Sequence, residues 1–313
     1  MRHAVLPNDL QNDLQNDLQN DLQVDLQQDS GHRADPTPLP GEIERPPSWH
    51  LFLTSFRVWA PLLHGLCLLA LVTGVTTRAL ILGIVLYWVR MFAMTGGYHR
   101  YFSHRSYRTS RPFQFLLGFL GTMGVERGPL WWAATHRKHH RHSDQRGDVH
   151  SPVQRGFWHA HLGWLAAEEQ METDLRLVKD LHRYPELRWL DRYHWVGPLC
   201  GLILCYLIAG ASGVVVGGIW STVALWHGTF SVNPLSHLFG SRRFATADDS
   251  RNHWLIALYT MGEGWHNNHH HFMASARQGF RWWEIDLSYY VLRGLAALGL
   301  VWDLKQPPPQ LLR

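Results

Sequence analysis

Long apolar runs restrict the fold of this 313-residue chain more than any other feature of its sequence. An α-helix needs about 20 mostly apolar residues to cross a bilayer. Because lipid offers no partners to backbone polar groups, such runs have to be helical. The runs that approach this length lie at roughly residues 58–76, 79–97, 195–212 and 213–232. Only short breaks separate the members of each pair, so the sequence predicts four transmembrane helices in two hairpins.

Two further apolar stretches are too short to span a bilayer. Residues 112–125 predict an interfacial or re-entrant helix. Residues 286–302 have a charged start followed by spaced apolar side chains, which predicts a helix lying in the membrane plane. The expected fold is therefore an all-α integral membrane protein whose spans carry a cytosolic helical cap.

Lysine and arginine residues predict the orientation in the membrane. The loop at 98–193 carries 15 of them, whereas the hairpin turns carry only Arg78. By the positive-inside rule, this loop and both termini lie in the cytoplasm, as in a multi-pass protein of the inner or cell membrane. The basic residues follow the spans rather than an aromatic-lined groove, so we expect the lipid bilayer as a partner and no nucleic acid.

The N-terminal residues differ in composition from the rest of the chain. Residues 8–29 repeat Asn-Asp-Leu-Gln, and one leucine in four residues buries too little apolar surface to offset the entropy of ordering. The prolines within residues 30–48 indicate a linker. We therefore expect a disordered tail and linker at 1–48, a membrane domain at 49–305 and a short tail at 306–313.

Histidine is the second feature that directs the interpretation, with 22 residues in the chain. Nine of them fall into four clusters close to the apolar runs, namely His99 and His104; His136, His139 and His140; His237; and His266, His269 and His270. Imidazole is a ligand of iron, zinc, copper and nickel. Because one ion takes about four such ligands, nine histidines predict a pair of ions rather than one.

The spacing within the clusters supports a shared centre that holds these ions. Both His-x-x-His-His clusters have positions i, i+3 and i+4, which share one face of a helix. Two such helices facing each other would direct six imidazoles at one centre. His99 and His104 are five residues apart, so their helix has to end or unwind between them. The sequence lacks the HExxH and GxSxG signatures of other metal or nucleophilic chemistry.

Taken together, the clusters and their flanking residues resemble the membrane fatty-acid desaturase family, nearest to the Δ9 acyl desaturases of the stearoyl-CoA type. The segments that carry the resemblance are 97–104, 132–140, 156–164, 233–240 and 262–270. The resemblance implies that the nine histidines bind two iron ions (Fe2+/Fe3+), with O2 as co-substrate, and that Asn233 reaches one iron through a water. It also implies a kinked tunnel for the acyl chain, bent at Trp132 and Thr229.

Glu263 precedes the fourth cluster and is a further candidate catalytic residue. Its carboxylate could orient a ligand imidazole through the second ring nitrogen. A carboxylate that simply starts a helix is an equally good interpretation of this position.

The expected function is that of a di-iron, O2-dependent desaturase that introduces a cis double bond, at Δ9, into a saturated fatty acyl chain. The carrier of that chain is CoA, acyl-carrier protein or a lipid, since Ala134 and Thr135 replace the Arg-Asp pair of the animal acyl-CoA members. We expect no fused cytochrome b5 domain, and hence a separate ferredoxin, rubredoxin or cytochrome b5-like donor with its reductase. The alternative is a histidine-box membrane hydroxylase or alkane monooxygenase; a catalytically silent binding protein would not need all nine histidines.

Overall fold

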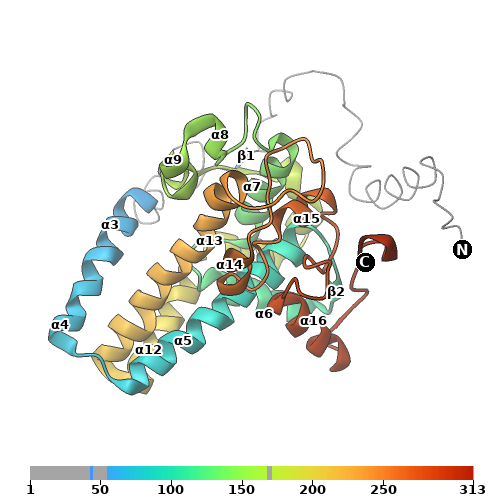
Figure 1. Cartoon of the computed structure of the whole chain (residues 1–313). Helices are drawn as coiled ribbons and strands as arrows, with labels where there is room; N and C mark the ends of the chain where they lie inside the picture. Colours follow the sequence, from blue (N-terminus) through green and yellow to red (C-terminus); the bar gives the residue numbers. More distant parts are fainter. Residues whose placement is uncertain (1–42, 45–54, 168–170, 313) are drawn as a thin grey trace, which may run out of the picture. The chain divides into compact units, whose positions relative to one another are not determined.

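The computed structural model describes residues 43–44, 55–167 and 171–312. Within the chain, Gly41–Arg313 form one compact unit, whose helices are drawn in Figure 1. The tail and linker predicted at 1–48 lie outside the described residues, apart from Ile43–Glu44, which form strand β1. The start of the membrane domain near residue 49 is also outside them, so both boundaries stay predictions.

Among the described residues, three helical stretches are long and apolar enough to cross a membrane, namely Phe56–Thr73, Thr77–Ser103 and Val196–Leu238. The first comprises α3 (Phe56–Leu66), the 3-10 turn η1 (Cys67–Leu69) and α4 (Ala70–Thr73). The second comprises α5 (Thr77–Phe92) and the π-helix η2 (Ala93–Ser103). The third comprises α12 (Val196–Ser212), the π-helix η6 (Gly213–Trp220) and α13 (Ser221–Leu238).

The third stretch is interrupted where the sequence predicts a break. Ala209 and Gly210 have non-helical backbone angles, and Gly210 has a φ of 60°, which glycine adopts without steric cost. After this break, η6 packs against α12. A Cβ atom added at Gly213 would lie 2.1 Å from the carbonyl oxygen of Cys205, so a side chain there would block this approach.

The outer faces of the helices in the candidate membrane stretches are apolar. Ile81 and Ile84 of α5 and Leu207 of α12 expose 57%, 60% and 75% of their surface, as expected of side chains that contact lipid. The charged Arg90 of α5 does not lie on this outer face, because it is buried and donates hydrogen bonds to Thr222 Oγ1 at 2.6 Å and to backbone carbonyls. Its charge therefore lies inside the helix bundle rather than reaching a membrane surface.

The remaining described elements are called the cap here and are mostly short helices. Residues 112–125, predicted as an interfacial helix, form α6 (Arg111–Thr122), and residues 286–302 form α16 (Leu287–Ala297) followed by β4 (Val301–Trp302). Strand β1 pairs with β3 (Thr173–Asp174), and β2 (Arg108–Thr109) pairs with β4, both antiparallel. The other elements of the cap are α7 (Pro129–His142), α8 (Pro152–Arg155), α9 (Phe157–His161), η3 (Gly163–Ala166), η5 (Leu175–Val178), α10 (Lys179–His182), α11 (Pro185–Arg192), α14 (Trp254–Tyr259), α15 (His266–His271) and η7 (Pro309–Leu312).

Helix α7 is held in place by hydrogen bonds to carboxylates of other cap segments. Its first amides, on Leu130 and Trp131, both donate to Asp191 Oδ1 at 3.0 Å, so a carboxylate from outside the helix caps its positive end. Arg137 extends from its middle to Asp180 Oδ1 at 2.8 Å. These contacts fix the rotation of α7 about its axis, and with it the direction of its three clustered histidines.

Candidate metal centre

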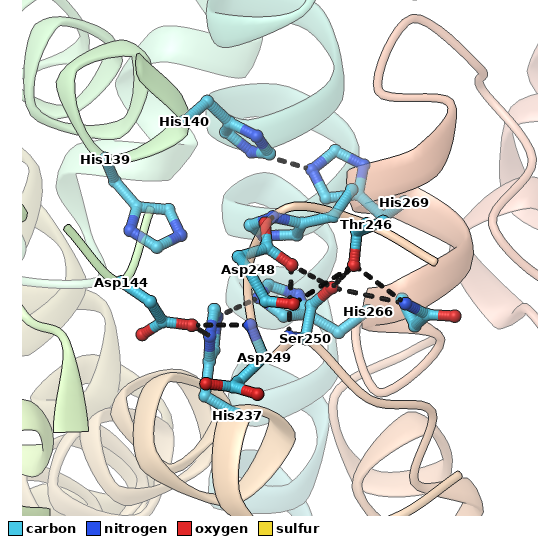
Figure 2. A network of polar contacts seen from close by, with 12 residues as sticks. His139, His140, Asp144, His237, Thr246, Asp248, Asp249, Ser250, His266 and His269 are labelled. Atoms are coloured by element: carbon cyan, nitrogen blue, oxygen red, sulfur yellow. Dashed lines mark hydrogen bonds and ion pairs between the residues drawn. The ribbon is translucent and has the colours of Figure 1, made fainter. Parts of the chain in front are cut away.

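The nine histidines selected from the sequence meet in two adjoining groups. One group has five members, His99, His104, His136, His140 and His269, and the other has four members, His139, His237, His266 and His270. In each group the ring nitrogens lie within 4.8 Å of one another. Figure 2 shows part of this arrangement, with His140 facing His269 and His237 beside Asp144.

The two His-x-x-His-His clusters exchange one member each. In α7, His136 and His140 at positions i and i+4 belong to the five-membered group, while His139 belongs to the other. In α15, His266 and His270 belong to the four-membered group, while His269 belongs to the five-membered one. The shared helical face predicted from the sequence is therefore divided between two neighbouring sites, and each helix contributes to both.

A change of helix type brings His99 and His104 together. On a regular α-helix, two residues five positions apart would lie on different faces, but η2 is a π-helix. In this form hydrogen bonds run from residue i+5 to residue i, as the amide of His104 does to the carbonyl of His99 at 3.2 Å. This wider turn brings residues five apart closer to one face, and the ring centroids of His99 and His104 are 4.9 Å apart.

The donor atoms of both groups suit metal ions. Facing Nε2 atoms are 2.8 Å apart for His104 and His136 and 3.0 Å apart for His99 and His269 and for His237 and His266. Two nitrogens that each lie about 2.1 Å from one ion are separated by roughly 3.0–3.4 Å. The Nε2 atoms of His139 and His270 are buried without a hydrogen-bond partner, which a metal would satisfy.

The protonation states of the rings fit the same role. Burial holds the pKa values of His104, His136, His140, His266 and His269 well below the ordinary value. These imidazoles are therefore neutral at physiological pH, which is the form that ligates a metal.

Four carboxylates each contact the Nδ1 atom of a histidine in one of the two groups. Asp148 lies 2.9 Å from His139 Nδ1, Asp144 lies 2.7 Å from His237 Nδ1, and Asp248 lies 2.6 Å from His270 Nδ1. Glu263 contacts His99 Nδ1 in the same way. A carboxylate in this position fixes the tautomer so that Nε2 carries the free lone pair.

The partners of these carboxylates keep them ionised. Burial alone would raise the pKa of Asp148, but the charge and hydrogen bond of His139 outweigh it and hold that pKa well below its usual range. The pKa of Glu263 is also lowered: burial opposes this, and His99 and Arg100 outweigh it. The Glu263 carboxylate accepts from Arg100 Nη2 at 3.2 Å. Glu263 is thus a positioning residue for His99.

Sequence reasoning selected only one of these four carboxylates. Asp144 and Asp148 follow directly after α7, and acidic residues just behind a histidine cluster are a signal that could have found them. Asp248 lies in a loop, 22 residues before His270, and no local pattern connects it to that ring.

Trp132, Thr229 and Asn233 line a small cavity of about 60 Å³ beside the histidine groups, together with His136. The Trp132 ring stacks on His136 with centroids 5.0 Å apart. Glu126, which the sequence analysis did not select, joins the first two residues: it accepts from Trp132 Nε1 at 3.2 Å and from Thr229 Oγ1 at 2.7 Å. Asn233 donates to the carbonyl of Ala160 at 3.3 Å.

A second, larger cavity lies among the candidate membrane stretches. It measures about 340 Å³ and is lined mainly by apolar side chains of α3, α5, α12 and α13, such as Leu63, Leu86, Leu202 and Trp226. Val125 belongs to this lining, and its neighbour Glu126 lines the smaller cavity. Two consecutive residues, at positions 125 and 126, therefore line the two different cavities.

Comparison with known proteins identifies the family to which this site belongs. The model of the fatty acid desaturase family matches residues 76–303. An sn-1 stearoyl-lipid 9-desaturase of Anabaena variabilis is 40% identical over 71% of this chain and 82% of its own length. A hex-5-enoyl-[acyl-carrier protein] acetylenase of Moorena producens is 37% identical (71% and 75%), and an sn-2 palmitoyl-lipid 9-desaturase of Nostoc is 35% identical (73% and 83%).

The chain therefore belongs to the fatty acid desaturase family, as the resemblance of its histidine clusters indicated. It is an oxidoreductase that desaturates fatty acyl chains, and its histidine groups are compatible with the metal centre that such a reaction needs. The matches do not favour the alternative of a membrane hydroxylase or alkane monooxygenase.

Proposed function

We propose that this protein is a di-iron, O2-dependent desaturase that introduces a cis double bond at the Δ9 position of a saturated acyl chain. The observation that carries the proposal is the division of nine buried histidines into a group of five and a group of four. Each group offers enough imidazole nitrogen donors for one ion. The names of the relatives from Anabaena and Nostoc, both 9-desaturases, support the position of the double bond.

In this proposal His99, His104, His136, His140 and His269 hold one iron, and His139, His237, His266 and His270 hold the other. When bound, the irons would supply the O2-dependent oxidation that removes two vicinal hydrogens from the acyl chain. Asn233 stands beside this centre and is proposed to hold a water toward one iron. The four carboxylates keep the ligand rings in a single tautomer, so the centre is organised before O2 arrives.

The protein's own residues would select the methylene that reacts. We propose that the acyl chain passes Trp132 and Thr229, which Glu126 connects, and that its far end occupies the apolar cavity among the spans. Methylenes form no hydrogen bonds, so the shape of this path has to set the position of the double bond. Excluding water from the path also protects the centre from side reactions.

A lipid or acyl-carrier protein is the proposed carrier of the acyl chain. Relatives are named for stearoyl-lipid, palmitoyl-lipid and acyl-carrier-protein substrates. Ala134 and Thr135 are the residues of this chain where the animal acyl-CoA members have an Arg-Asp pair, and neither can pair with phosphate as arginine does.

The proposed membrane arrangement has four spans in two hairpins. Phe56–Thr73 and Thr77–Ser103 would form the first hairpin, and the interruption at Gly210 would divide Val196–Leu238 into the second. By the positive-inside rule, the cap, the metal centre and both termini face the cytoplasm. Electrons would come from a separate ferredoxin, rubredoxin or cytochrome b5-like donor and its reductase, which an exposed basic cytoplasmic surface would attract.

Expression in a host that lacks its own desaturase tests the proposal. The expected result is new monounsaturated acyl chains, with the double bond located by mass spectrometry after derivatisation. The His139→Ala variant, produced at the same level in the same membranes, is the matched control. New hydroxylated chains without double bonds, or no new product from a correctly inserted wild-type protein with its metals bound, would contradict the proposal.

A further inference from the structure

Part of the cap exposes large apolar side chains although it lies outside the three candidate membrane stretches. Trp254 and Leu258 of α14 are 67% and 47% exposed, and Trp282 in the segment before α16 is 83% exposed. Leu298 after α16 and Trp302 of β4 are 74% and 42% exposed. We call α14, residues 281–285, α16 and β4 the C-terminal apolar face. Soluble surfaces rarely gather so many large apolar side chains, and such patches mark contact with a partner or with lipid.

This face is continuous with the proposed spans. Tyr87 Oη of α5 donates to the carbonyl of Tyr259 at the end of α14, at 2.8 Å, and the Tyr259 hydroxyl lies 2.7 Å from Ser231 Oγ of α13. On α16, Ser288 Oγ lies 2.5 Å from Thr95 Oγ1 of η2. Tyr87 is ten residues from the start of its stretch at Thr77, or about 15 Å along the helix, within a hydrocarbon layer of about 30 Å. The end of α14 is therefore attached at membrane depth.

Between residues 251 and 302 the charged side chains that reach solvent are basic, and the exposed Asp303 directly after β4 pairs with Arg108 at 3.5 Å. Between residues 251 and 302 the acidic side chains are Glu263, Glu284 and Asp286, and all three are buried. The arginines are half-buried or exposed, namely Arg251, Arg277, Arg281 and Arg293. Arg281 lies over the ring of Trp283, with its guanidinium carbon 5.0 Å from the centroid. Tryptophan with neighbouring arginine is the combination found where proteins meet lipid headgroups.

We propose that the C-terminal apolar face is embedded in the membrane leaflet nearest the metal centre, and that Arg281 and Arg293 bind anionic lipid headgroups there. A lipid surface fits better than a protein partner because the face continues from the sides of α5 and α13. The exposed arginines of the face, with Asp303 at its edge paired to Arg108, also complement an anionic leaflet. The inference rests on the proposed spans and does not depend on the reaction.

The face has a direct connection to the metal centre. Glu284, on the inner side of the segment that carries Trp282, accepts from Asn268 Nδ2 at 2.9 Å and from the amide of Phe280 at 2.6 Å. Asn268 lies between His266 and His269 in α15. Lipid packed against this segment would therefore support the helix that supplies ligands to both histidine groups.

Probe quenching in lipid bilayers tests the location of the face. In a full-length variant with Cys67, Cys200 and Cys205 changed to alanine, a fluorophore is attached at Trp282→Cys or, as control, at the exposed Gln145→Cys in the loop after α7. The expected result at position 282 is strong quenching by nitroxides on lipid acyl chains and weak quenching by a water-soluble nitroxide. Position 145 should show the reverse.

The other outcomes at position 282 would overturn the proposal. Quenching only from water would show that the face is solvated, and shielding from both quenchers would show that a second copy or another protein covers it. Neither outcome depends on turnover, so failure here is distinguishable from failure of the proposed function.

Selectivity for anionic lipid is measured separately with spin-labelled phosphatidylglycerol and phosphatidylcholine. Each basic residue at a membrane surface favours anionic lipid by about fivefold. The double variant Arg281→Gln/Arg293→Gln should therefore lower the preference for phosphatidylglycerol by at least about fivefold, while Arg146→Gln, on the loop of the control position, should leave it unchanged. An unchanged preference in the double variant would exclude these arginines as headgroup ligands.

Discussion

The two histidine groups differ in the number of imidazoles that they contain and in the number of those rings that contact a carboxylate. The five-membered group has one more imidazole, but within the described residues only one of its rings, His99, contacts a carboxylate. The four-membered group has fewer nitrogens, but Asp148, Asp144 and Asp248 hold three of its rings. One site thus relies on the number of neutral ligands and the other on nearby negative charge. Neighbouring ions in one centre would therefore experience different electrostatic surroundings.

The surroundings of the groups differ as well. His136 of the five-membered group lines the small cavity and stacks on Trp132. The four-membered group adjoins the loops that supply Asp144 and Asp248. We therefore expect changes near the cavity to alter the choice of product, and changes at the carboxylates to alter metal affinity.

The largest effect should come from removing one ligand from each group. We expect His139→Ala and His269→Ala each to lower activity by more than about 100-fold, since loss of a residue that merely supports a ligand already costs roughly 10–100-fold. Metal analysis of the purified proteins should give two ions for the wild type and about one for each variant. His182→Ala, in α10, is the control. One ion or fewer in the fully loaded wild type would refute the two-ion centre.

Removing the charge of single carboxylates sharpens the contrast between the groups. Asp148→Asn and Asp144→Asn should each weaken metal binding by about 10–100-fold, because the imidazole keeps its place but loses its ionised partner. Glu263→Gln should act on the five-membered group alone. Chelator titration followed by metal analysis measures this. Equal loss of metal from both groups in every variant would show that the ions bind as one unit. The exposed Asp303→Asn is the control and should leave metal binding unchanged.

Trp132→Ala probes the cavity side of the five-membered group. Discrimination by shape is worth about 1–3 kcal/mol per methylene, so we expect the double bond to spread over neighbouring positions or chain lengths. The measurement is the distribution of double bonds among saturated substrates of several lengths, with the exposed Trp158→Ala as control. An unchanged distribution at full metal occupancy would mean that other residues bound the path of the acyl chain.

Glu126 provides a contrast with the carboxylates that contact histidines, because its hydrogen-bond partners among the described residues, Trp132 and Thr229, are uncharged. Burial raises its pKa from 4.5 to about 7. Between pH 4.5 and about 7 the folded protein therefore binds a proton that the unfolded protein has lost. The free energy of unfolding should fall as pH rises through this range and stay constant above it. Glu126→Gln should remove this dependence and stabilise the protein at pH 8 by up to about 3 kcal/mol.

Thermal unfolding of both proteins from pH 4.5 to 8 measures the effect of Glu126. A variant whose stability falls with pH as steeply as that of the wild type would show that this carboxyl is not the titrating group. The Thr229 hydroxyl can donate to the ionised Glu126 carboxylate. It can also accept from the protonated carboxyl while donating to the carbonyl of Leu225, 3.1 Å away.

Removal of residues 1–48 should have the smallest effect. None of the histidines or carboxylates of either group precedes His99, so a protein that starts at Trp49 and inserts normally should keep its activity. A loss of activity at unchanged metal content would indicate that the repeat serves in docking.

The nine histidines could be predicted because their signal is local. A helix places i, i+3 and i+4 on one face whatever surrounds it, and the apolar runs before the clusters indicated membrane spans. The division between the groups could not be predicted, because it depends on how α7 and α15 face each other. The π-helix η2, which carries His99 and ends just before His104, was predicted only as a departure from α-helical geometry.

Contacts between distant segments explain what the sequence left out. Asp248 reaches His270 through a loop, and Glu126 connects Trp132 to a helix about a hundred residues later. Arg90 lies within the apolar run at 79–97, and its guanidinium is satisfied inside the bundle by Thr222. Each of these partners is chosen by tertiary packing, which leaves no periodic signal in the chain.

The four carboxylates behind the imidazoles also set the electric charge of the buried centre. Asp144, Asp148, Asp248 and Glu263 are at most 10% exposed in their side chains and together contribute four negative charges. Two divalent ions contribute four positive charges, and Asp286 balances the charge of Arg100, which contacts Glu263, so the centre would be electroneutral in its reduced form. Oxidation would then leave uncompensated positive charge where water cannot screen it. The protein would thereby favour the reduced centre and make the return of electrons from the donor downhill.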